Sequence, residues 1–154
     1  MELIKSFTTE QFESALAAWE WIGLTGKTAL CASLFGDVFF DSEEGLWWLD
    51  TLNGELTRPW DNADDLEKEL DTADGMEQYL LATLAADTAA TGLVPAENEV
   101  YDFVQPPILG GELEVANVQV TDFVTALSIA GQIHGRVADL PPGAEIDPQL
   151  LVLE

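Results

Sequence analysis

Residues 37–50 read Asp-Val-Phe-Phe-Asp-Ser-Glu-Glu-Gly-Leu-Trp-Trp-Leu-Asp. Two short runs rich in aromatic and aliphatic residues flank the polar sequence Ser-Glu-Glu-Gly at 42–45, which is typical of a turn. If those four residues form the loop, Phe40 lies opposite Trp47 on one apolar face. The stretch therefore predicts a β-hairpin with one face in the core.

The opposite face of this hairpin would carry an aromatic pair surrounded by acidic residues. Two interpretations stay open: a helix covers the pair, which we favour, or the pair is presented to a protein partner. Exposed aromatic anchors are typical of interface hot spots. Two aspartates directly across from each other would repel, so a shifted register or a bridging basic group is also expected. In the second interpretation the partner-binding residues are Phe39, Trp48, Asp37, Asp41 and Asp50.

The neighbouring segments extend the hairpin into a sheet. Residues 29–35 have the composition of a strand, Asn53-Gly54 is a tight-turn signal, and residues 55–58 continue the meander until Pro59 switches the chain to helical spacing. With a later strand or two, these segments predict an α+β fold. We expect a mainly antiparallel sheet with helices packed mostly on one face.

Helical periodicity appears on both sides of the predicted sheet. Thr8 and Gln11 form a capping box, which predicts a first helix from about Thr9 to Trp21. A short amphipathic helix containing Leu66 and Leu70 and a second one over residues 75–90 follow the sheet. Asp61, Asp64 and Asp65 could hold a hard metal ion, but capping and the helix dipole already explain acids at a helix start.

The last third of the chain predicts a strand and a long helix. Residues 112–120 alternate like a strand, and Thr121 or Asp122 would cap a helix through Val137. Gly131 and Gly135 each weaken this helix by about 1 kcal/mol relative to alanine, so close packing against them is required. A final strand is expected over 147–153. Residues assigned to an architectural motif between the strands are Pro106, Pro107, Gly110, Gly111 and Asn117.

Composition and charge limit the functions that the chain can perform. Its 154 residues contain 29 acidic and five basic side chains, a formal net charge of -24, with 47% hydrophobic residues. This length and apolar content predict a single folded domain. Nucleic-acid binding depends on Lys and Arg at phosphates, so direct DNA or RNA binding is not expected. The acidic field favours a basic protein partner, although many bacterial proteins are acidic for solubility alone.

The chain has few side chains that could bind a soft metal ion or act as a nucleophile. Cys31 is the only cysteine and His134 the only histidine, which excludes an intrachain disulfide and the usual zinc or Cys-His sites. We expect no catalytic residue, no metal and no cofactor, and we interpret His134 as a packing residue. The first residues lack the pattern of a signal peptide and no apolar run is long enough for a membrane span, which predicts a cytoplasmic protein.

The order of motifs in residues 99–136 resembles a known family. Pro106-Pro107, Gly110-Gly111, Asn117 and the sequence Gly-Gln-Ile-His at 131–134 follow one another as in the C-terminal domain of bacterial type VI secretion immunity proteins, formerly a domain of unknown function. The resemblance extends upstream through residues 34–50. It covers roughly residues 30–146, with 1–28 as an N-terminal helical lead-in.

The resemblance implies an immunity protein, since the best-known members of this family neutralise a DNase toxin. The partner would then be a basic, nuclease-type toxin, and the chain would not be an enzyme. A regulatory or protein-interaction module of the same family without a toxin partner is the alternative. An enzyme that uses dispersed carboxylates comes third, and only a deep pocket with converging acids would favour it.

Overall fold

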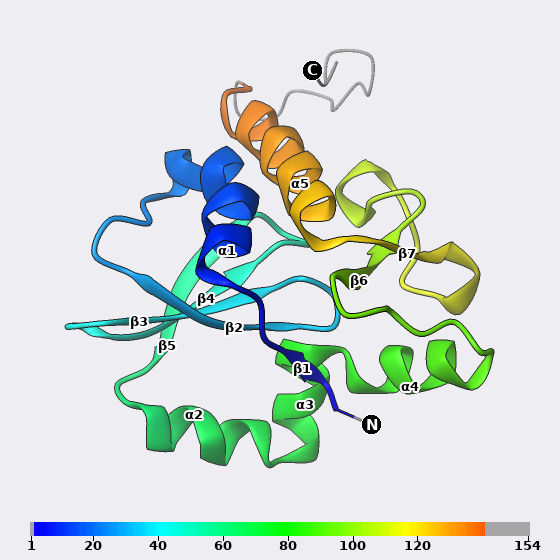
Figure 1. The fold of residues 1–154 in the computed structure, drawn as a ribbon, viewed down its shortest axis with the longest axis horizontal. Coiled ribbons are helices and arrows are strands. Elements are labelled where there is room, and N and C mark those ends of the chain that lie inside the picture. The colour runs from blue at the N-terminus through cyan, green and yellow to red at the C-terminus, as the bar shows by residue number, and fades with distance from the viewer. Residues whose placement is uncertain (1, 141–154) are drawn as a thin grey trace.

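A five-stranded antiparallel sheet forms the centre of the computed structural model, which describes residues 2–140 (Figure 1). Its strands follow the order β1-β2-β3-β4-β5, so each strand pairs with its neighbour in sequence. This all-next-neighbour order is a meander, as the turn signals predicted. The strands are β1 (Ile4–Lys5), β2 (Thr28–Ser33), β3 (Val38–Ser42), β4 (Gly45–Asp50) and β5 (Glu55–Trp60).

The predicted register of the β3–β4 hairpin is confirmed. Phe40 pairs with Trp47, and Phe39 pairs with Trp48 on the opposite face. The strands separate before the predicted pair of aspartates, because β3 begins at Val38. Asp37 and Asp50 are therefore not paired in the ladder, although burial, and then the charge of Asp50, raise the pKa of Asp37. The register is not shifted, and within residues 2–140 no basic side chain forms an ion pair with either aspartate.

Strand β5 continues two residues further than expected, through Pro59 to Trp60. Proline lacks an N–H for the ladder, which led to a predicted end at Arg58. Because β5 is an edge strand, its outer side needs no hydrogen-bond partner and proline is tolerated there.

The first helix begins at the predicted capping box. Oγ1 of Thr8 accepts a hydrogen bond from the Gln11 N–H (3.1 Å), and Oε1 of Gln11 accepts one from the Thr8 N–H (2.9 Å). Helix α1 (Thr9–Leu16) tightens into the 3-10 helix η1 (Ala17–Ile22), which ends at Gly23 with φ 96°.

The helical segment expected over residues 75–90 is two helices. α3 (Ala73–Leu80) and α4 (Ala82–Ala90) are separated by Leu81, which adopts a left-handed conformation with φ 50°. α2 (Ala63–Leu70) precedes them, as its apolar spacing predicted. The break at Leu81 lets α4 leave the main sheet and pack against the strands that follow.

The C-terminal part forms a second, two-stranded sheet instead of extending the first one. β6 (Glu99–Phe103) pairs with β7 (Val118–Asp122), so only residues 118–120 of the strand expected over 112–120 are extended. The 3-10 turn η3 (Val115–Asn117) precedes them, and a second one, η2 (Pro107–Leu109), lies earlier in the same loop. Helix α5 (Phe123–Ala138) is capped by Asp122 as predicted. The expected strand over 147–153 lies outside the described residues.

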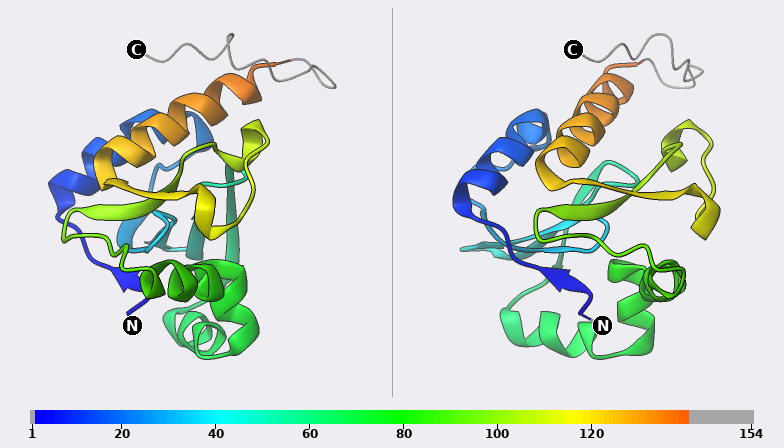
Figure 2. Two further views of the ribbon diagram at one scale, coloured as in Figure 1. Left: turned by 90° about the vertical axis from the view of Figure 1, so that its right-hand side faces the viewer. Right: turned by 45° about the vertical axis from the view of Figure 1, so that its right-hand side comes forward.

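The α+β class is confirmed, but the helices lie on both faces of the main sheet (Figure 2). α1 and α5 cover the face of Val38, Phe40 and Leu49, whereas α2 and α3 cover the face of Phe39 and Trp48. Both faces of β3 and β4 carry large apolar side chains, so each face needs cover. This replaces the one-sided packing expected from the sequence.

Candidate protein-binding cleft

The aromatic pair on the hairpin is covered by a helix and does not form an exposed patch. Phe39 is fully buried, and Trp48 is half-buried with its ring edge-to-face against Tyr79 of α3 at 4.7 Å. Nε1 of Trp48 is buried and forms no hydrogen bond of good geometry within residues 2–140, although it faces Asp37, where it opposes the rise in pKa that burial causes. The interpretation of helix cover is thus the one that the fold supports.

The acidic residues predicted around this pair have mainly structural surroundings. Asp37 and Asp50 are buried, and only Asp41 is exposed. Asp37 accepts hydrogen bonds from the Thr51 N–H (3.0 Å) and hydroxyl (2.5 Å). Asp50 accepts bonds from the Leu52 and Asn53 backbone N–H groups, which closes the turn between β4 and β5. Burial, and then the charge of Asp50, raise the pKa of Asp37 to about 7.

His134 is the packing residue that the sequence predicted. It is buried in α5, and its Nε2–H donates to the carbonyl of Thr51 at 2.8 Å. Its ring lies 5.7 Å from that of Trp19, and burial lowers its pKa. A Cβ at Gly54 would lie 2.4 Å from Nδ1 of His134, so the turn after β4 needs glycine there.

The predicted architectural motif closes the long loop between β6 and β7. The Asn117 side chain accepts from the Gln105 N–H (3.0 Å) and donates to the carbonyls of Gln105 (2.9 Å) and Glu112 (3.0 Å). Gly110 adopts φ 97°, and a Cβ on Gly111 would lie 1.7 Å from the Gln105 carbonyl oxygen. The motif therefore holds the segment 105–111 in one conformation.

This loop forms one wall of a cleft whose other wall is α5. The volume of the cleft is about 290 Å³. A helical stripe of α5 faces it with Ala126, Ile129, Ala130 and Ile133, and the loop contributes residues 106–109. Two of the lining residues are open to solvent: Ile129 is 39% exposed, and Val104, which follows β6, is 64% exposed.

Among residues 2–140, Asp102 is the one acidic residue that lines the cleft. It lies on β6 opposite Gln119 of β7, and its Oδ2 accepts long hydrogen bonds from Gln119 Nε2 (3.4 Å) and the Thr121 hydroxyl (3.3 Å). Burial raises the pKa of this carboxyl group. Asp102 carries no sequence signal of its own, because nothing local distinguishes it from the other acidic residues of the chain.

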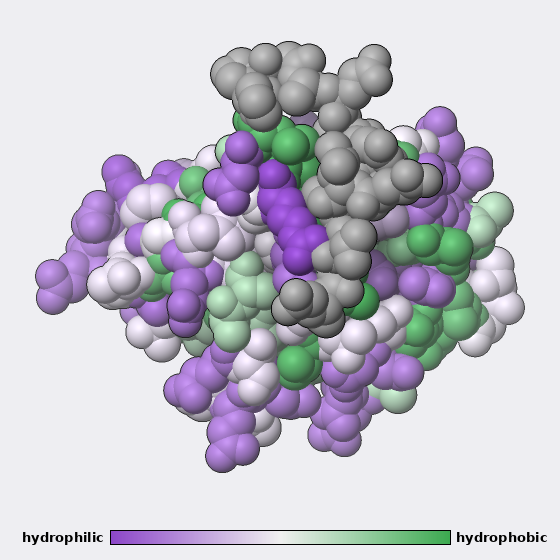
Figure 3. All heavy atoms as spheres, turned by 90° about the horizontal axis from the view of Figure 1, so that it is seen from above, coloured by the Kyte–Doolittle hydropathy of each residue, from purple (hydrophilic) through white to green (hydrophobic). Residues whose placement is uncertain are grey.

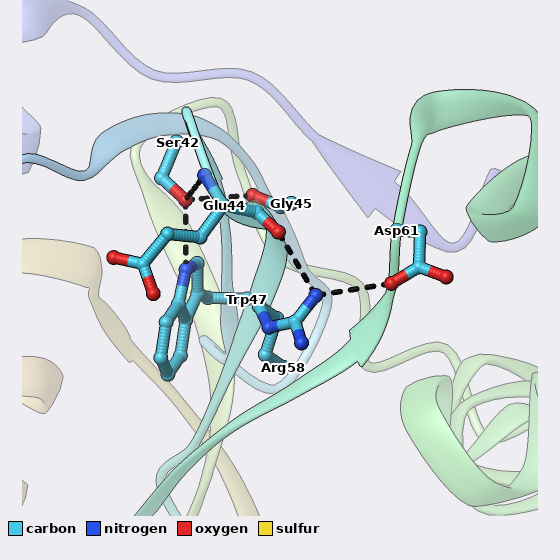
Figure 4. A network of polar contacts seen from close by, with 6 residues as sticks. All are labelled: Ser42, Glu44, Gly45, Trp47, Arg58 and Asp61. Carbon is cyan, nitrogen blue, oxygen red and sulfur yellow. Dashed lines mark hydrogen bonds and ion pairs between the residues drawn. The ribbon is translucent and has the colours of Figure 1, made fainter.

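Polar side chains at the tip of the β3–β4 hairpin form a hydrogen-bond network that is separate from the cleft (Figure 4). Arg58 donates to the Glu44 carbonyl (2.9 Å) and to Asp61 (3.0 Å), and Trp47 Nε1 donates to the Ser42 hydroxyl (2.9 Å). The Arg58–Asp61 contact is the one ion pair within residues 2–140. Most acidic side chains in that range therefore have no cation beside them.

Metal binding and membrane insertion find no support in the described part of the chain. No group of three His, Cys, Asp or Glu side chains between residues 2 and 140 could hold a metal ion. The Asn62 side chain caps α2, and Asp64 and Asp65 lie in the first turn, where the helix dipole favours acidic side chains. In the same range no helix has the length and apolar character to cross a bilayer.

The part of the chain that supplies most of the cleft lining is similar to a known protein family. Residues 61–134 match the family described as T6SS immunity protein Tdi1, C-terminal, where T6SS is the type VI secretion system. The match includes the architectural motif and His134 and confirms the resemblance. It begins after β5, so the wider extent of 30–146 stays a prediction.

A solved structure supports the fold beyond the matched residues. The crystal structure of Atu4351 from Agrobacterium tumefaciens is similar with a TM-score of 0.51 and 21% sequence identity, over 84% of this chain and 66% of that one. The chain thus spans slightly less than two thirds of Atu4351. At this identity the likeness concerns the fold alone. No curated protein matches the chain.

Proposed function

We propose that this chain is an immunity protein that binds a secreted nuclease-type toxin in the cytoplasm and neutralises it without catalysing a reaction. The observation that carries the proposal is the match of residues 61–134 to the Tdi1 C-terminal family. The matched residues contain α2 to α4, the second sheet and most of α5. They include Asp102, the α5 stripe and the loop that line the cleft, with only Thr51 and Leu52 contributed from outside.

The charge of the chain supports a basic partner. Acidic residues outnumber basic ones 29 to five, and one ion pair is present among the described residues. A surface with so many unpaired carboxylates attracts a positively charged protein over long range. Nucleases carry positive charge where they bind phosphates. An acidic inhibitor can therefore approach the surface that the substrate would occupy.

Exposed apolar residues around the cleft supply the short-range part of such an interface. Val104 and Ile129 line the cleft and are 64% and 39% exposed, and Leu113, in the same loop as Val104, is 52% exposed. The view onto α5 has hydrophobic patches between hydrophilic ones (Figure 3). Apolar anchors inside a polar rim are the usual composition of a protein interface.

Co-expression tests the proposal. The gene next to that of this chain is expressed in a bacterial host with and without the chain, and viable cells and intact chromosomal DNA are measured. We expect the neighbour to degrade DNA alone and to be harmless with the chain, and the two proteins to purify together. A neighbour without toxicity, combined with capture of a non-toxic partner from the native strain, would favour the regulatory module.

A further inference from the structure

We propose that the cleft between α5 and the loop 105–109 binds a long basic side chain of the toxin, arginine or lysine. The aliphatic stem lies along the α5 stripe and the charged head reaches Asp102. This inference rests on the proposed function for the identity of the partner. Its chemical basis is the cleft itself, which can be probed without any toxin.

The walls of the cleft fit an aliphatic stem. Ile129, Ala130 and Ile133 of α5 face Ile108 and Leu109 of the loop. A volume of about 290 Å³ is at the lower end of small-molecule sites and suits a single inserted side chain. Arginine and lysine bury their methylene groups along apolar surfaces of this kind while the charged end seeks a polar partner.

The polar partner is Asp102. Its two side-chain hydrogen bonds measure 3.3 and 3.4 Å, which is beyond the usual range for bonds to a carboxylate, and it forms no ion pair within residues 2–140. Three of the five basic residues are engaged elsewhere: Lys5 with two backbone carbonyls, Lys27 over the Trp47 ring, and Arg58 with Asp61.

A cation in the cleft would stabilise the partly buried Asp102 carboxylate better than a neutral group would. Burial raises the pKa of Asp102, which means that the negative form is incompletely solvated. A purely apolar insert would remove the remaining water from the carboxylate and supply nothing in return. A guanidinium or ammonium group replaces that water with a charge-assisted hydrogen bond, and a guanidinium can form two.

A small probe tests this chemistry directly. Nα-acetyl-arginine amide and its citrulline analogue, which has nearly the same shape without the charge, are titrated into the chain carrying labelled isoleucine methyl groups. We expect saturable NMR shifts of the Ile129 and Ile133 methyl signals with the arginine probe alone. The shifts should vanish in Asp102→Asn and persist in Asp87→Asn, since Asp87 is exposed on α4 away from the cleft. Equal shifts from both probes, or none, would overturn the proposal.

The toxin complex provides the second test, with the same two variants. Asp102→Asn should weaken binding of the co-purified toxin about 30-fold or more, as expected when one partner of a buried charge pair is removed. Asp87→Asn makes the same change in net charge and should have little effect. Thermal melts of both variants establish that they are folded. If the toxin is neutralised equally by Asp102→Asn, the cleft proposal fails and the immunity function stands. If the arginine probe binds but the chain neutralises no toxin, the cleft proposal stands and the immunity function fails.

Discussion

Trp48 distinguishes most clearly between the two interpretations of the hairpin, as a core element or as a binding surface. Its ring packs edge-to-face on Tyr79 between the main sheet and α3. Trp48→Ala should therefore lower the free energy of unfolding of the isolated protein by about 3 kcal/mol, measured by chemical denaturation. Trp48→Phe keeps most of this contact and removes an Nε1–H that forms no hydrogen bond of good geometry within residues 2–140, so it should cost much less. If Trp48→Ala left the stability unchanged and weakened the toxin complex, Trp48 would be an interface residue and not a core residue.

Asp37 predicts a pH dependence of stability. Its pKa is raised from 3.8 to about 7 in the folded protein, so the folded state holds this proton where the unfolded state has already released it. The contribution of Asp37 to stability is full below about pH 4 and is lost as the pH rises through about 7. Asp37→Asn retains an acceptor for Thr51 and should flatten the decline in unfolding free energy over this window. Asp41→Asn, on an exposed position, should keep the wild-type profile, and a parallel profile for Asp37→Asn would contradict the assignment.

At the scale of elements, the crossing of α5 over η1 depends on Gly131. A Cβ there would lie 2.8 Å from both the Cβ and the carbonyl oxygen of Ala18. Gly131→Ala should thus destabilise the protein by about 1–3 kcal/mol despite the better helix propensity of alanine, as thermal or chemical unfolding can measure. A Cβ on Gly135 would lie 3.0 Å from Nε1 of Trp21, whose N–H donates to the carbonyls of Ala18 and Gly131. This contact is less severe than the one at Gly131 and involves no backbone atom, so Gly135→Ala should cost less. A stabilised Gly131→Ala would show that the two helices are not in close contact.

Elements whose signals are local could be predicted from the sequence, and elements placed by distant contacts could not. The hairpin register follows from its own loop and alternation, and the start of α1 follows from Thr8 and Gln11. The break at Leu81 had no local signal, because leucine rarely adopts φ 50° and only packing on two different sheets requires it there.

The candidate site was predictable only in its framework. Asn117 and the glycine pair pointed to an architectural loop, and the Asn117 side chain hydrogen-bonds backbone groups of Gln105 and Glu112 in that loop. The role of Asp102 could not be predicted, because its partial burial arises where α5 crosses β6, and that crossing joins segments about 30 residues apart in a way that periodicity does not specify.

At the scale of the whole molecule, the net charge of -24 should govern the response to salt. Carboxylates without nearby cations repel one another more strongly in the folded state than in the expanded one. Raising sodium chloride from about 10 mM to about 150 mM shortens the Debye length from about 30 to about 8 Å and should raise Tm in a thermal melt. A Tm that falls over this range would show that attractive charge pairs dominate.

The same charge allows a direct test of whether this acidic chain binds a basic toxin. The rate constants of association and dissociation are measured for the purified chain and the co-purified toxin over that salt range. We predict an association rate that falls by about tenfold or more, because steering acts at long range, and a dissociation rate that changes little, because short-range contacts hold the complex. An association rate that is independent of salt would contradict the account.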